Sequence, residues 1–217
     1  MLPRSKLILA ALTVAIALTT GVGAASANRL SVNEKRFVID WITRAEFPEE
    51  TKLSFIAAGR TVRCTVRLAG NFSSEVITKS AGTTIGSITG ATIGECEGGT
   101  AAPFNETLPW RVVYVSFTGT LPAITGVTVS LVGVRVRVTP TGLPECNATT
   151  TAANPANGIF NVQATTPRSI RSLRSDETKA IPLEGGFACT LAGSGTLSGL
   201  ALVWNAARTA LVSMTLI

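Results

Sequence analysis

The stretch Val62-Arg-Cys-Thr-Val-Arg-Leu68 alternates apolar and polar side chains with a period of two. Successive side chains of a strand point to opposite faces of its sheet, so valine, cysteine and leucine share one face while arginine and threonine share the other. The run Val134-Arg-Val-Arg-Val138 repeats the pattern. Both runs are typical of antiparallel sheets with one apolar face and one face in water.

Glycine and proline divide the rest of the chain into short strand-like runs. The chain has 20 glycines and 10 prolines, many of them in turn-like sequences such as Ala69-Gly-Asn71 and Asn157-Gly158. Such spacing favours many short strands over helices. We therefore predict an all-β protein, an antiparallel β-sandwich with two disulfides, and keep a barrel-like closure as the open alternative.

Three segments carry more specific predictions. The runs 108–118 and 127–139 predict a hairpin that is closed by residues 119–126. The segment 28–50 is interpreted as a strand, with a short helical turn as the alternative. The segment 149–180 is rich in Thr, Ala, Asn, Pro and Arg, which predicts a long excursion between strands rather than a second core.

The N-terminus has the three parts of a secretory signal peptide. Arg4 and Lys6 precede a predominantly apolar run from Leu7 to Leu18, and small residues follow up to Ala25-Ser-Ala27. This order predicts cleavage after residue 27, with an uncleaved anchor as the alternative. We expect a single mature domain, 28–217, that is secreted to the extracellular space or held in the cell envelope, without a stable membrane span after cleavage.

Charge and composition exclude several classes of function. Removal of the signal peptide lowers the formal net charge from +6 to about +4, which is too mild to predict a nucleic-acid partner. The chain has no histidine, so Ser-His-Asp and Cys-His catalysis are excluded, and so is the commonest zinc ligand. We expect no enzyme activity, no catalytic residues, no cofactor and no metal site.

The cysteines predict a disulfide framework. The four cysteines, Cys64, Cys96, Cys146 and Cys189, form an even set in a chain that we expect to be exported. Three pairings are possible. Cys96 and Cys146 lie at similar sequence distances from the centre of the predicted hairpin, so we expect them to pair, and we expect Cys64 to pair with Cys189.

Arginines on the polar strand face are the candidate binding residues. If their strands are neighbours, the guanidinium groups form a basic panel for phosphate or carboxylate groups of an extracellular polymer. The alternative is that they only keep the sheet soluble and protect its edges. The candidate residues are Arg63, Arg67, Arg135 and Arg137.

Other arginines and the tryptophans have plainer interpretations. Arg168, Arg171 and Arg174 recur every three residues, which favours a solvated loop, with a helical anion-binding face as the alternative. The three tryptophans lie among apolar residues and are predicted to belong to the core rather than to a sugar-stacking platform. They are Trp41, Trp110 and Trp204.

Several motifs resemble known exported proteins. The motifs are Cys64-Thr-Val-Arg-Leu-Ala-Gly70, Leu108-Pro-Trp-Arg111, Phe117-Thr-Gly-Thr-Leu-Pro122, Thr151-Ala-Ala-Asn-Pro-Ala-Asn-Gly158 and Ile181-Pro-Leu-Glu-Gly-Gly-Phe187. Over roughly residues 60–217 they resemble a group of bacterial exported proteins without an assigned function. The order of the cysteines is distantly similar to the PraB family, named as activators of alkane oxidation. Neither resemblance implies catalytic residues.

Three classes of function follow from these features. We favour a secreted or cell-surface protein that acts by binding or assembly, in an extracellular matrix or envelope or on an anionic or hydrophobic ligand, because exported sheet proteins without acid/base groups act through their surfaces. The expected partner is an extracellular anionic polymer or a hydrophobic compound. A small outer-membrane-type β-barrel is the second class, and a hydrolase that lacks histidine is the third.

Overall fold

Strands dominate the molecule. The computed structural model describes residues 29–41, 52–120, 123–163 and 168–216, and the strands of this part are joined by antiparallel pairings. This confirms the prediction of an all-β fold. The predicted signal peptide, 1–27, lies outside the described residues. Within the described ranges, no helix is both long enough and apolar enough to cross a membrane.

The elements alternate regularly along the chain. The first are β1 (Arg29–Val32), β2 (Arg36–Trp41), β3 (Leu53–Ala57), β4 (Arg60–Phe72), β5 (Val76–Thr78), β6 (Thr84–Glu97), β7 (Gly99–Pro103), the 3-10 helix η2 (Asn105–Thr107) and β8 (Trp110–Thr120). The remainder are β9 (Ala123–Val132), β10 (Arg135–Pro140), β11 (Cys146–Thr149), β12 (Ala156–Val162), β13 (Ile170–Ser175), β14 (Ile181–Gly185), α1 (Phe187–Ala192), β15 (Ser194–Ser198), β16 (Leu200–Asn205) and β17 (Met214–Leu216).

Eight strands close into a barrel. Their order is β2-β16-β13-β12-β9-β8-β6-β4, and pairing of β4 with β2 closes the ring. Closure leaves no free edge in this ring, which removes the templates on which other strands could pair. The barrel-like alternative of the sequence prediction is therefore the observed form.

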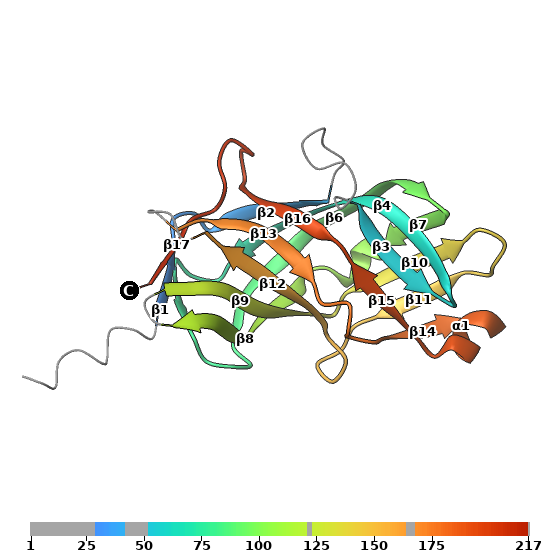
Figure 1. Cartoon of the computed structure of the whole chain (residues 1–217). Coiled ribbons are helices and arrows are strands. Elements are labelled where there is room, and N and C mark those ends of the chain that lie inside the picture. The colour runs from blue at the N-terminus through green and yellow to red at the C-terminus, as the bar shows by residue number, and fades with distance from the viewer. Residues whose placement is uncertain (1–28, 42–51, 121–122, 164–167, 217) are drawn as a thin grey trace, which may run out of the picture.

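The remaining strands lengthen the barrel wall. β3 follows β2 and pairs with the same strand, β4, while β15 precedes β16 and pairs with β3. In the same way, β14 follows β13 in the chain and β10 follows β9. Beyond β4, the order of hydrogen-bonded strands in the sheet continues as β3-β15-β14-β11-β10-β7. Long passes of the chain thus run up and down side by side, and several are interrupted at mid-length (Figure 1).

The two ends of the elongated barrel are built differently. A small sheet, β17-β1-β5, lies at one end, where Leu30, Ile77 and Met214 are buried. Helix α1 lies at the other end (Figure 1) and exposes Phe187 and Leu191. Between the ends, the inward-facing apolar side chains of the wall form one core cluster, as the period of two requires.

Two predictions about segments have different outcomes. The hairpin is confirmed, because β8 pairs with β9 and Phe117 lies opposite Val127. The pairing continues to Thr120 opposite Ala123, so the strands extend into the segment 119–126 that was predicted to close the hairpin. The prediction of a long excursion over 149–180 is wrong, because this segment contains β12 and β13, two strands of the barrel ring. Two of its asparagines, Asn157 and Asn161, alternate with buried residues of β12, which composition alone does not distinguish from a loop.

Both predicted cystine pairings are wrong, although all four cysteines do form disulfides. Cys64 is bonded to Cys96 and Cys146 to Cys189. The physical reason is the up-and-down order: β4 and β6 are adjacent, and β11 pairs with β14, which leads directly into α1. Each bridge therefore joins neighbouring passes. Two disulfides are typical of an oxidising compartment.

Candidate functional site

Arg63 and Arg67 lie on β4 and point out of the barrel, as predicted. Arg67 is engaged: its Nε donates a 2.7 Å hydrogen bond to Oδ1 of Asp40. A nitrogen of Arg208 lies 2.8 Å from the other oxygen of the same carboxylate, whose side chain is fully buried. A buried carboxylate needs such partners, because its desolvation is costly. Arg67 therefore stabilises the wall and is not free to bind a ligand.

Arg135 and Arg137 form a separate group on β10. Their guanidinium carbons lie 4.6 and 5.0 Å from the centre of the Phe104 ring. Arg137 also forms an ion pair of 3.1 Å with Glu145. These contacts fit cation–π stacking at a partly exposed site.

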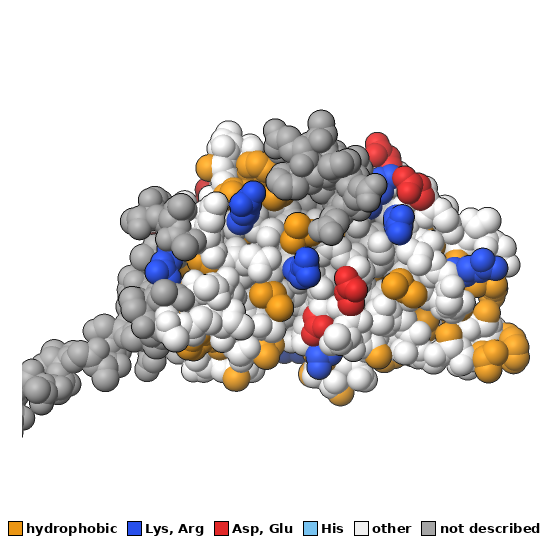
Figure 2. Space-filling model, viewed as in Figure 1, with side chains coloured by type: hydrophobic (Ala, Val, Ile, Leu, Met, Phe, Trp, Pro, Cys, Tyr) orange, Lys and Arg blue, Asp and Glu red, His pale blue; other side chains and the backbone are white. Residues whose placement is uncertain are grey.

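The four candidate arginines are not brought together into one panel. β4 and β10 are not hydrogen-bonded neighbours, since β3, β15, β14 and β11 separate them in the sheet order. Figure 2 shows the Lys and Arg side chains of the visible face spread out, with acidic side chains between them. Binding of an anionic polymer remains a prediction, but these four arginines do not form one surface for it.

A polar cleft on the outer wall gathers a different set of cations around Arg63. It has a volume of about 310 Å³, and we call it the basic cleft. It lies on the outside of the wall, near the point where the β15–β3 pairing ends and the β16–β2 pairing begins. Its lining residues are Lys52, Ser54, Arg63, Arg174, Glu177, Ser198, Gly199 and Leu200.

The arginines of the basic cleft have unused binding capacity. Arg63 and Arg174 are exposed, and within the described residues neither forms an ion pair. Glu177 in the same cleft already accepts a 2.6 Å hydrogen bond from Ser198 Oγ. Two guanidinium groups that form no ion pair with a described residue can take bidentate contacts from an added oxyanion.

The third cation of the cleft has a partner at its rim. Lys52 Nζ lies 2.6 Å from Oε1 of Glu97. The hydrogen bond and the charge of Lys52 hold the pKa of the Glu97 carboxyl below its ordinary value, with a smaller contribution from Arg63. Glu97 therefore stays ionised in mild acid and offsets part of the positive charge of the cleft.

The Lys52–Glu97 pair predicts a specific pH response. The folded-state pKa of Glu97 is lowered, so its contribution to stability is present above the ordinary carboxyl pKa and is lost as the pH falls through the lower folded value. An NMR titration of the Glu97 carboxyl carbon should give a midpoint below the ordinary range. Lys52→Met should raise that midpoint, whereas Lys179→Met should not. An unchanged midpoint in Lys52→Met would contradict the assignment.

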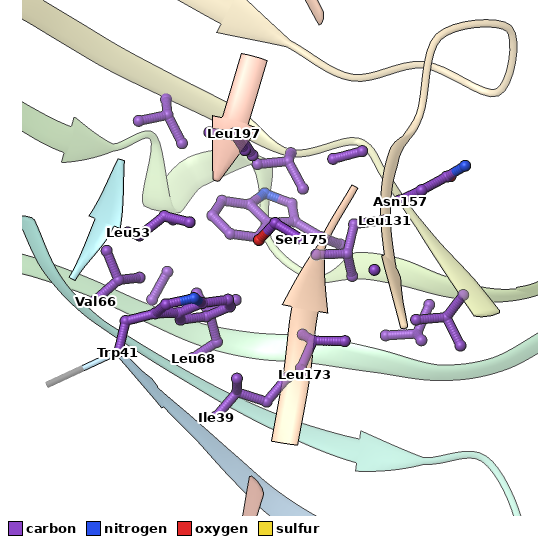
Figure 3. Close-up of a pocket in the computed structure, with 18 of the residues that line it drawn as sticks. Ile39, Trp41, Leu53, Val66, Leu68, Leu131, Asn157, Leu173, Ser175 and Leu197 are labelled. Atoms are coloured by element: carbon purple, nitrogen blue, oxygen red, sulfur yellow. The ribbon is translucent and has the colours of Figure 1, made fainter. Parts of the chain in front are cut away.

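The interior of the barrel contains an apolar cavity of about 60 Å³ behind the basic cleft. Figure 3 shows side chains from several strands converging on it, among them Trp41, Leu53, Leu173 and Leu197. Few polar side chains line it; Asn157 and Ser175 are two of them. Eight-stranded barrels of this kind either fill their interior with side chains or hold one small ligand.

The tryptophan prediction holds for the residues at the cavity. Trp41 and Trp110 are each 2% exposed and line the cavity, while Trp204 is half-buried. Sequence reasoning missed Lys52 as a site residue, and it placed Arg174 in a solvated loop, with a helical anion-binding face as the alternative. Arg174 lies on β13 and not in a loop, and its alternation with buried Leu173 was the available signal.

No family model, no curated protein and no solved structure matches this chain. The site must therefore be interpreted from its own geometry.

Proposed function

We propose that this protein is an exported, non-catalytic binding protein that takes up an anionic ligand in the basic cleft. The observation that carries this proposal is the pair of exposed guanidinium groups, Arg63 and Arg174, in one cleft without ion-pair partners among the described residues. Such groups attract oxyanions and can bind them with paired hydrogen bonds. The two disulfides support an oxidising, extracellular site of action.

The polarity of the wall supports a water-facing binding protein over an outer-membrane barrel. On β4, Val62, Val66 and Leu68 are buried in the barrel, while Arg63 and Arg67 are on the outside. Membrane barrels have the opposite arrangement, with an apolar outer band against lipid and a polar interior. Arginines at mid-wall are costly in contact with hydrocarbon.

Retention on a sulfated dextran column tests the proposal. We expect the Arg63→Gln/Arg174→Gln double variant to elute at clearly lower salt than the unmodified protein, because two of the groups that contact the anion are lost. Retention of the unmodified protein should itself disappear near 1 M salt, where the Debye length is about 3 Å.

A charge-matched variant separates site binding from net charge. Arg36→Gln/Arg171→Gln removes the same two charges from exposed positions outside the cleft, so it should shift elution much less. Equal shifts for the two double variants would mean that the column responds only to overall charge, and the proposed site would be abandoned.

A further inference from the structure

The basic cleft and the apolar cavity lie on opposite faces of the same stretch of wall. Leu53 and Leu197 line the cavity, while their neighbours Ser54 and Ser198 line the cleft. On β13, Ser175 lines the cavity and the preceding Arg174 lines the cleft. Because side chains alternate between the two faces of a strand, a thin wall separates a cationic outside from an apolar inside.

Gly199 lies at a break between two ladders of the wall. The pairing of β16 with β2 ends at Leu202 opposite Asp40, and that of β15 with β3 ends at Ser198 opposite Ser54. Gly199 lies in the gap between these ladders, where its carbonyl accepts a 3.0 Å hydrogen bond from the Ser175 N–H and no side chain covers the backbone. A Cβ atom there would meet the indole of Trp41 at 3.2 Å. Only backbone therefore lies between the cleft and this indole.

Trp41 has an unused hydrogen-bond donor at this position. Its Nε1 is buried and has no acceptor among the described residues. Buried indole N–H groups normally have a hydrogen-bond acceptor, because a buried donor without one costs free energy. By contrast, Trp110, which lines the same cavity, donates a 2.8 Å hydrogen bond to Thr107 Oγ1. The Nε1 donor of Trp41 is therefore available to an acceptor that the described residues do not supply.

We propose that the ligand is a small carboxylate with a short apolar chain, bound across the wall at Gly199. This inference rests on the proposed function and deepens it. The carboxylate lies at the gap, where Arg63 and Arg174 face it from the cleft and Trp41 Nε1 donates to it from within. The alkyl chain lies in the barrel cavity, where it is removed from water.

The volume of the cavity limits the length of the chain. An apolar cavity of about 150 Å³ admits benzene, and this cavity holds about 60 Å³. The space suits about two to four carbon atoms. Each methylene buried there should raise the affinity about fourfold. Butanoate has two methylenes more than acetate and is therefore expected to bind about sixteenfold more tightly, while octanoate should bind no more tightly than butanoate.

Calorimetric titration of the mature, disulfide-bonded protein tests this inference. The probes are acetate, butanoate and octanoate, with sulfate as a head group without a chain and 1-butanol as a chain without a charge. Butanoate should bind most tightly of these short probes and should change the tryptophan fluorescence. Sulfate should compete with butanoate, because both occupy the cleft.

Three variants assign the parts of the site. Arg63→Gln/Arg174→Gln should weaken butanoate about tenfold or more. Trp41→Phe retains an aromatic ring but removes the donor, so it should weaken butanoate and abolish most of the fluorescence change. Ala91→Leu places a larger side chain in the cavity, so it should weaken butanoate to the level of acetate while sulfate binding is unchanged. Circular dichroism checks that each variant is folded.

The outcomes separate the two proposals. If acetate, butanoate and sulfate bind equally well and Ala91→Leu has no effect, the cavity is not used and this inference is wrong, although the anion-binding function stands. If neither the carboxylates nor sulfate bind, both proposals fail. If 1-butanol binds as tightly as butanoate, the cavity alone binds ligands and the carboxylate assignment is overturned.

Discussion

Replacing Cys146 and Cys189 by alanine is expected to lower the free energy of unfolding by about 4 kcal/mol. The bridge closes a loop with a sequence separation of 43, so its removal releases a large conformational freedom of the unfolded chain. Cys64→Ala/Cys96→Ala, with a separation of 32, should cost nearly as much. Each loss is a large part of the stability of an ordinary domain. Urea titration of each double variant measures the effect.

Peptide mapping without reduction provides the control for these variants. It should recover Cys64 linked to Cys96 and Cys146 linked to Cys189. Recovery of Cys96 linked to Cys146 would contradict the observed strand order, because that bridge would join passes that are not neighbours here. Single-cysteine variants are unsuitable, since the remaining thiol can form a wrong bond.

Phe160→Ala is the second substitution with a large expected effect, a loss of about 3–5 kcal/mol in the free energy of unfolding. Phe160 is 1% exposed on β12 and lines the interior cavity, so truncation removes apolar contacts and enlarges the empty space. Denaturant unfolding measures the loss. If the variant remains folded at low temperature, its larger cavity should also accept carboxylates longer than butanoate.

Phe187→Ala is the matched control for this substitution. It makes the same chemical change at a residue of α1 that is 82% exposed, so the free energy of unfolding should change by no more than about 0.5 kcal/mol. Similar losses for Phe160→Ala and Phe187→Ala would mean that Phe160 does not contribute to the core as described.

Local alternation explains how much of the fold was predictable. The inward and outward positions of β4 and β10 follow directly from the apolar–polar period, and the structure confirms them at Val62, Arg63, Val136 and Arg137. The period was harder to recognise over β12, where a glycine occupies a buried position, and it breaks on β13, where Ser172 and Leu173 are buried in succession. There the burial of Phe160 and Leu173 depends on neighbouring strands rather than on local sequence.

The candidate site was only partly predictable for the same reason. Arg63 was identified because it lies on a clearly alternating strand. Its partners in the basic cleft, Lys52 and Arg174, are 11 and 111 positions away in the numbered chain. Only closure of the barrel brings β3, β4, β13 and β15 to one place.

Local sequence is sufficient to specify that this chain forms antiparallel strands, which side chains of the clearly alternating strands β4 and β10 face the interior, and that four cysteines are available for disulfides. These properties depend on the alternation of neighbouring residues and on composition. The neighbours of each strand, the pairing of the cysteines and the juxtaposition of the basic cleft with the apolar cavity are set by the folded arrangement of the whole chain. These depend on contacts between distant segments, which form only when the ring closes and so leave no local pattern in the sequence.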